Sequence, residues 1–187
     1  RSIVINYLIT GLLLITGCST KDKSSSKESK VLNVKEIKLN PGDYNAIEGS
    51  SEVLWECEWL GGARHDGSVQ LVSGSIDISE TSDVNGRFIV DLNSMKCFDL
   101  TNEGTNKKLI GHLKSDDFFD VANYPEAVLD LISGKNISGN NFEFSGNLTI
   151  KGRTHPIIFT GTVIENKLSY DTNLKLIFDR SKYDVRY

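Results

Sequence analysis

Residues 168–178 read LSYDTNLKLIF, and this stretch decides the fold class. Every second side chain from Leu168 to Phe178 is apolar or a threonine, whereas the positions between them are polar apart from Ile177. Successive side chains of a β-strand point to opposite faces, so a period of two indicates a strand with one buried face. The stretch therefore predicts a β-strand and not a helix.

The same period of two recurs through most of the chain, at residues 53–59, 69–78, 88–92, 127–131, 142–150 and 157–163. Clusters of residues typical of turns separate these stretches, at 82–86, 138–141 and 165–167. Gly74 interrupts one stretch, which favours a β-bulge there. Seven or eight short strands at this spacing predict an antiparallel sandwich or barrel.

Residues 106–121 do not alternate and are the exception. The spacing of Leu109, Ile110 and Leu113 is helical, and Ser115 followed by acidic residues is typical of a helix N-cap. We therefore expect an all-β antiparallel fold with one short helical insert over 106–121.

Length and charge exclude several classes of protein. The chain has 187 residues, enough for one domain with a core that needs no disulfide or metal to fold. It carries 21 basic and 25 acidic side chains, a formal net charge of -4. A nucleic-acid partner held on a basic surface is therefore not expected.

The N-terminal segment has the features of an export signal. Residues 3–17 are almost wholly apolar, but they are too few for a membrane span, which needs about 20 residues. The order Leu14 to Gly17 and then Cys18 resembles a bacterial lipobox, in which the cysteine is acylated after the signal is removed. The alternative is a short buried helix with an incidental cysteine. The first reading predicts a lipoprotein signal peptide over 1–17 and acyl chains, such as palmitate, on Cys18.

The next segment is polar and separates the acylated cysteine from the domain. Residues 21–30 read KDKSSSKESK and contain no apolar side chain, so they are expected to form a flexible tether. This divides the chain into the signal peptide, a lipidated tether over 18–30 and a β-domain over 31–187. Ser19 after the cysteine resembles the sorting signal for an outer membrane, so we expect a lipid-anchored envelope protein facing the periplasm.

Two long motifs resemble those of the YceI-like envelope proteins. One is HLKSDDFFDV at 112–121 with YPEA at 124–127, and the other is GNLTIKGRTHPI at 146–157. RHDGSV at 64–69 and FDRS at 178–181 match shorter motifs of the family. The resemblance implies a lipocalin-like, eight-stranded barrel that holds a long polyisoprenoid chain. The family continues beyond the Arg186–Tyr187 step, so we expect the closing C-terminal strand to be missing from 31–187.

The inward positions of such a barrel would form an apolar cavity. We expect it to be lined by Trp55, Trp59, Val90, Leu92, Leu129, Phe142, Phe144, Leu148 and Phe159. With the resemblance, such a cavity predicts a membrane-anchored carrier that sequesters or transports a quinone or a polyprenyl phosphate. The alternative is a structural or interaction module of the envelope whose own side chains fill the barrel.

Histidines and cysteines give no catalytic or metal-binding spacing. His65 and His112 fall in the family motifs and either contact a lipid head group or make structural hydrogen bonds, and His155 is read as a turn residue. Without HExxH, CxxC or a nucleophile motif, we expect no enzyme, no cofactor and no metal, and we assign no oligomeric state. Cys57 and Cys97 are either a disulfide or free thiols, and both alternatives stay open.

Overall fold

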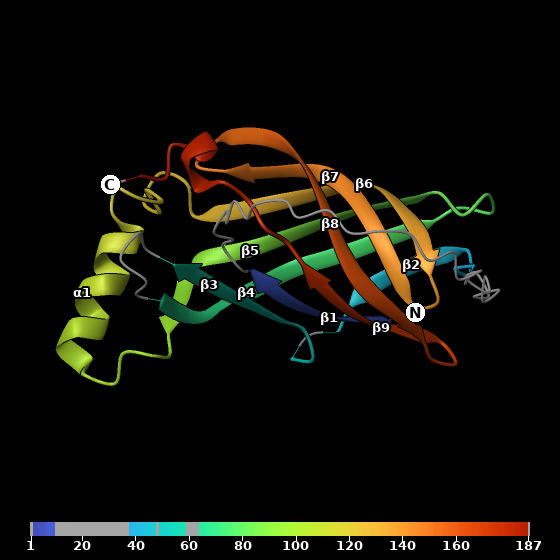
Figure 1. Ribbon diagram of the computed structural model, residues 1–187, viewed down its shortest axis with the longest axis horizontal. Helices are drawn as coiled ribbons and strands as arrows, with labels where there is room; N and C mark the ends of the chain where they lie inside the picture. Colours follow the sequence, from blue (N-terminus) through green and yellow to red (C-terminus); the bar gives the residue numbers. More distant parts are fainter. Residues whose placement is uncertain (1, 10–37, 48, 59–63, 187) are drawn as a thin grey trace, which may run out of the picture.

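The computed structural model describes residues 2–9, 38–47, 49–58 and 64–186, and its strands form one continuous sheet (Figure 1). The strands are β1 (Ser2–Ile9), β2 (Gly42–Ala46), β3 (Glu52–Glu58), β4 (Arg64–Ile78), β5 (Val84–Cys97), β6 (Glu126–Ser138), β7 (Asn141–Ile150), β8 (Arg153–Glu165) and β9 (Ser169–Lys175). A helix, α1 (Glu103–Lys114), and a 3-10 turn, η1 (Arg180–Tyr183), complete the described elements.

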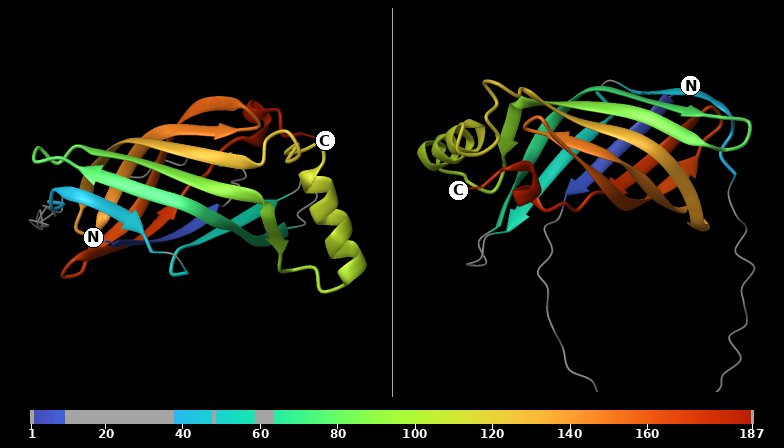
Figure 2. Two further views of the ribbon diagram at one scale, coloured as in Figure 1. Left: turned by 180° about the vertical axis from the view of Figure 1, so that it is seen from behind. Right: turned by 90° about the horizontal axis from the view of Figure 1, so that it is seen from above.

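Strands β3 to β9 pair antiparallel in chain order, and the sheet then closes on itself through β1. β1 lies between β3 and β9 and is parallel to both, while β2 pairs with β1 and with β4. The predicted all-β barrel is confirmed, and Figure 2 shows it from two further directions. β1 occupies the place between β3 and β9, and the expectation that a closing C-terminal strand is missing stays a prediction.

The predicted N-terminal division falls mainly on residues that are not described. Residues 2–9 form β1, whereas residues 10–17, Cys18 and the tether at 18–30 lie outside the described residues. The signal peptide, the acylation of Cys18 and the tether remain predictions.

Glycines make room for large side chains inside the barrel. The ladder between β4 and β5 shifts register between Ser68 and Gln70 and again between Leu71 and Ser73, just before the bulge expected at Gly74. A Cβ on Gly74 would lie 2.7 Å from the ring of Phe88. The missing side chain therefore allows that ring to occupy the lumen beside β4.

The helical insert is confirmed, but its bounds differ from the predicted 106–121. Asn102 caps α1, because its side chain accepts a hydrogen bond from the Thr105 amide at 3.1 Å. Ser115 ends the helix instead of capping its start, and its amide donates to the His112 carbonyl. The acidic residues after Ser115 therefore lie in turns. Among the described residues, no helix has the length and apolarity required to cross a membrane.

The half of the barrel farther from α1 is filled by aromatic rings, and we call it the closed half. Phe144 stacks on Phe142 at 6.0 Å and on Phe159 at 5.4 Å between ring centroids, and Tyr44 packs against Tyr170 at 5.0 Å. These five side chains are buried. Dense packing of this kind leaves no room for a ligand.

Candidate functional site

The half of the barrel next to α1 contains a cavity of about 330 Å³, and we call it the hollow half. Ligand pockets in proteins have volumes of about 300–1,000 Å³, so this cavity lies at the lower end of that range. On the strand side its apolar lining includes Val53, Trp55, Val69, Leu71, Phe88, Val90, Leu92, Met95, Ala127, Leu129, Leu148 and Ile150. Strand alternation turns these side chains inward from β3, β4, β5, β6 and β7.

Helix α1 and the turns after it cover the end of the cavity. Leu113 of α1 is buried, and Phe118 and Phe119 follow it and line the same space. The rings of Phe118 and Phe119 meet edge to face at 5.1 Å, and the ring of His112 lies 5.6 Å from Phe118. The motif at 112–121 therefore forms the apolar cover of the cavity.

The chain after β9 supplies a cation at the cavity wall. Arg180 lines the cavity, and its guanidinium lies 5.1 Å from the centre of the Phe118 ring, a distance that allows a cation–π interaction. Its Nη1 donates to the Val185 carbonyl at 2.7 Å. Ser181 donates to Asp179 and lowers the pKa of that carboxyl, so Asp179 is charged beside Arg180.

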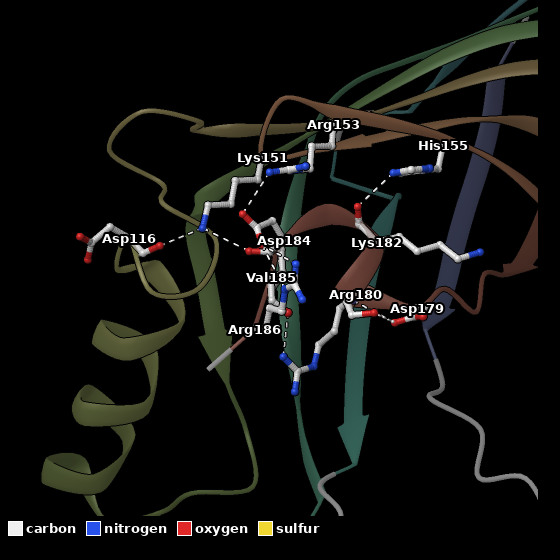
Figure 3. Close-up of polar contacts among 11 residues, drawn as sticks. Asp116, Lys151, Arg153, His155, Asp179, Arg180, Lys182, Asp184, Val185 and Arg186 are labelled. Atoms are coloured by element: carbon white, nitrogen blue, oxygen red, sulfur yellow. Dashed lines mark hydrogen bonds and ion pairs between the residues drawn. The ribbon is translucent and has the colours of Figure 1, made fainter.

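Ion pairs hold this segment against the turn between β7 and β8 (Figure 3). Arg153 contacts Asp184 at 3.1 Å, and Lys151 donates to the carbonyl of Asp116 at 2.8 Å and to that of Asp184 at 3.3 Å. The hydrogen bond from Arg186, followed by the charge of Arg153, lowers the pKa of Asp184. These contacts fix the position of the segment that carries Arg180.

The expected cavity residues divide between the two halves of the barrel. Five line the cavity: Trp55, Val90, Leu92, Leu129 and Leu148. Three pack in the closed half instead: Phe142, Phe144 and Phe159. Trp59 lies outside the described residues. Whether any of them contacts a ligand remains a prediction.

Sequence reasoning missed Phe118, Phe119 and Arg180. The adjacent phenylalanines were assigned to a helix, although two neighbours on a helix point in different directions. Arg180 belongs to the FDRS motif at 178–181, which indicates the family but not the role of the arginine. Its place just after the alternating stretch 168–178, whose buried side faces the lumen, was the available signal.

The three histidines lie apart, and only His112 touches the cavity cover. His155 belongs to β8 and not to a turn, and its Nε2 donates to the Lys182 carbonyl at 3.0 Å. His65 lies on β4, where its Nδ1 is 2.7 Å from Asp99 Oδ2. Neither His65 nor His112 is among the described residues that line the cavity, so contact with a head group remains a prediction.

Cys57 and Cys97 are both free thiols in the structure. Cys57 lies opposite His65 in the β3–β4 ladder and lines the cavity, whereas Cys97 is buried at the end of β5. Burial raises the pKa of each thiol. The sequence left open whether Cys57 and Cys97 form a disulfide or stay free thiols, and in the structure they stay free.

A second depression, of about 270 Å³, lies at the other end of the barrel. Its lining includes Asn40, Glu165 and Lys167 beside the β8–β9 turn. The polar lining suits water better than an apolar chain. The hollow half therefore holds the candidate site.

Known proteins place the chain in a family. The model of the YceI-like domain matches residues 44–187. UPF0312 proteins of Pseudomonas savastanoi pv. phaseolicola and Pseudomonas syringae pv. tomato are each 35% identical over 83 residues, which cover 44% of this chain and 38% of the relative. The match thus spans less than half the length of these relatives.

A solved structure agrees in fold. BcnA of Burkholderia cenocepacia is 23% identical and covers 64% of this chain and 72% of its own, with a TM-score of 0.55. At this identity the likeness shows the fold alone. The family model covers more than half of the chain, and with the barrel and its motifs it shows that the chain belongs to the YceI-like family.

Proposed function

We propose that the protein binds a long-chain isoprenoid lipid, a quinone or a polyprenyl phosphate, with part of its prenyl chain in the hollow half of the barrel. The observation that carries the proposal is the apolar cavity of about 330 Å³ under α1. A closed barrel of eight strands is wide enough for one slender ligand.

Burial of the prenyl chain would provide most of the affinity. Each buried methylene contributes about 0.8 kcal/mol, so one five-carbon unit contributes about 4 kcal/mol. Three such units match the cost of association, which is about 4–15 kcal/mol. Binding of this kind requires an apolar wall, to which Val90, Leu129 and Leu148 contribute.

Lipid extraction and uptake test the proposal on the full chain. We expect mild organic extraction of the purified protein to release a prenyl lipid detectable by mass spectrometry. Protein stripped of lipid should take up added ubiquinone saturably, with quenching of Trp55 fluorescence, because that ring lines the cavity. An extract without prenyl lipid, together with no saturable uptake, would overturn the proposal.

Matched tryptophan substitutions on β6 separate a carrier from a filled barrel. Leu129 lines the cavity, whereas Leu131 is buried two residues further on the same face and is not among the lining residues. Leu129→Trp should change stability by less than about 1 kcal/mol and lower ubiquinone uptake, because the indole occupies the lipid space. Leu131→Trp should cost about 1–3 kcal/mol through overpacking and spare uptake in the folded fraction. Equal destabilisation by both would favour the interaction module.

We also propose that Cys18 anchors the protein to a bacterial envelope membrane, on the periplasmic side of the outer membrane. The proposal rests on the apolar stretch 3–17 and the lipobox-like order before Cys18. Two or more acyl chains give stable anchoring where one is marginal. Cleavage before Cys18 would also remove β1 and expose the strand edges that it pairs in β3 and β9.

Acylation is tested by intact-mass measurement and fractionation of cells. The wild-type protein should begin at Cys18 with acyl mass added and sediment with membranes, and Cys18→Ser should lose both properties. Cys57→Ser is the matched control and should remain membrane-bound. Membrane retention of Cys18→Ser, with no added acyl mass in the wild type, would contradict the anchor.

A further inference from the structure

A cluster of three different donor groups lies beside the cavity, at the start of β4 and the end of β5. His65 Nδ1 is 2.7 Å from one carboxylate oxygen of Asp99, and the Cys97 thiol donates to the other oxygen at 3.1 Å. All three donor atoms lie within 4.8 Å of one another. One carboxylate thus connects an imidazole and a thiol.

The strand register brings these groups together. Gly67 pairs with Cys97 in the β4–β5 ladder, so His65, two residues before Gly67, meets Asp99, two residues after Cys97. A Cβ on Gly67 would lie 1.8 Å from the Lys96 carbonyl and 2.7 Å from the Trp55 ring. The glycine is therefore required for close packing of the strands next to the cluster.

Surrounding hydrogen bonds fix the cluster in place. The Asp66 amide donates to Asp99 Oδ1 at 3.1 Å. The side-chain amide of Asn106, on α1, donates to the carbonyls of Cys97 and Leu100 at 3.0 and 2.9 Å. The carboxylate and the loop that carries it are held by neighbours outside the cluster, which is how proteins orient metal ligands.

We propose that His65, Cys97 and Asp99 bind a divalent transition metal ion of the zinc type. Imidazole nitrogen, thiolate sulfur and carboxylate oxygen are the ligands that zinc takes in proteins. At metal–ligand distances of about 2.0–2.3 Å, tetrahedral donors lie about 3.3–3.8 Å apart. Side-chain movements of about 1 Å therefore convert the hydrogen-bonded cluster into a coordination sphere.

Charge and access both suit a divalent cation. Coordination releases the Cys97 thiol proton to solvent, so thiolate and carboxylate together balance the two positive charges. Cys97 is buried, while the side chains of His65 and Asp99 are 19% and 26% exposed, which leaves a path for the ion. Three protein ligands leave the fourth tetrahedral position for water or another oxygen donor.

Cobalt(II) titration of the full chain tests the site, because thiolate-bound Co²⁺ shows a charge-transfer absorption band. The wild-type protein should bind one Co²⁺ with this band, and Zn²⁺ should displace it. Cys97→Ser should abolish the band, and His65→Gln and Asp99→Asn should each lower the affinity for Zn²⁺ by more than about tenfold. Circular dichroism checks that each variant is folded. If His65→Gln or Asp99→Asn does not fold, Cys97→Ser still tests the site, because it is nearly isosteric with the wild type.

Two controls match the ligands in type. Cys57→Ser changes the other described cysteine, which lies opposite His65 on β3, and His112→Gln changes the histidine on α1. Both should keep the band and bind Zn²⁺ within about threefold of the wild type. A wild type without the band would overturn the proposal. So would a band that survives in Cys97→Ser or is lost equally in Cys57→Ser.

Discussion

The two halves of the barrel are built from the same strands and the same alternation, yet one is filled and the other is hollow. In the closed half, Phe144 lies stacked between Phe142 and Phe159. In the hollow half, the inward position Leu148 on the same strand β7 borders a cavity that Trp55 and Phe88 also line. The difference lies in how the inward side chains pack and not in the pattern of alternation.

Glycines opposite the phenylalanines complete the filling of the closed half. A Cβ on Gly134 would lie 2.8 Å from the Phe144 ring. In the hollow half, by contrast, aliphatic side chains and the rings of Trp55 and Phe88 surround a cavity. Rings face glycines in both halves, since Phe88 lies beside Gly74 in the hollow half, but in the closed half three rings stack on one another and fill the lumen.

The largest expected effect is on stability, from matched phenylalanine truncations in the two halves. Phe144→Ala should lower the free energy of unfolding by about 3–5 kcal/mol, because it opens a void in a packed stack. Phe119→Ala should cost only about 1–2 kcal/mol, because this half-buried ring already borders a cavity. Urea unfolding of both variants measures the difference.

The contrast between the closed and hollow halves would be wrong if the two truncations lowered the free energy of unfolding equally. Equal losses near the upper value would mean that Phe119 is packed on all sides, and so that the cavity is closed in solution. Equal small losses would mean that the closed half relaxes around the void. Lipid added in excess should raise the stability of Phe144→Ala and change that of Phe119→Ala less, because Phe119 contributes to the cavity wall.

These two halves also mark what the sequence could predict. The period of two identified the strands and which side chains point inward, because pleating alone sets that direction. It could not separate Leu129, at the cavity, from Phe142, in the closed half, because both occupy inward positions. That distinction depends on what faces each side chain across the lumen, and cross-strand neighbours follow from register.

The sequence patterns did not predict the cover of the cavity or the cluster of His65, Cys97 and Asp99, for a related reason. Ser115 with acidic residues after it has the composition of an N-cap, but Asn102 makes the cap and Ser115 ends the helix. His65 and Asp99 are 34 residues apart in sequence. Spacing rules for metal ligands apply to one loop or helix, so they do not find donors that only strand pairing brings together.

An effect of intermediate size is expected at the cavity wall, on the relative affinities for a polyprenyl phosphate and for ubiquinone. Arg180 is the basic residue among the described cavity-lining residues. Arg180→Gln should weaken binding of a polyprenyl phosphate by about tenfold, since a hydrogen bond to a charged group contributes about 1.5–3 kcal/mol. Ubiquinone binding should change by less than about threefold, and competition between the two lipids measures both.

Arg87→Gln is the matched control, because Arg87 pairs with Asp130 on the exposed side of β5 and β6, outside the cavity lining. It should leave both affinities unchanged. Equal weakening of both lipids by Arg180→Gln would show that this arginine supports the wall through Val185 and Phe118 instead of selecting an anionic head group. The cavity would then select its ligand by the prenyl chain and not by the head group.

The smallest effect concerns two glycines at the cavity end of the barrel. Lys151 and Gly152 form the two-residue turn between β7 and β8, with φ of 49° and 69°, and a Cβ on Gly152 would lie 2.8 Å from the Tyr124 ring. Gly152→Ala should therefore cost about 1–2 kcal/mol. Gly111, on the exposed side of α1, has no atom within 4 Å of an added Cβ, so Gly111→Ala should stabilise by about 0.5–1 kcal/mol. Thermal unfolding of both variants measures these two changes in stability, which should have opposite signs. A stabilising Gly152→Ala would mean that the turn at this end of the barrel adopts another conformation in solution.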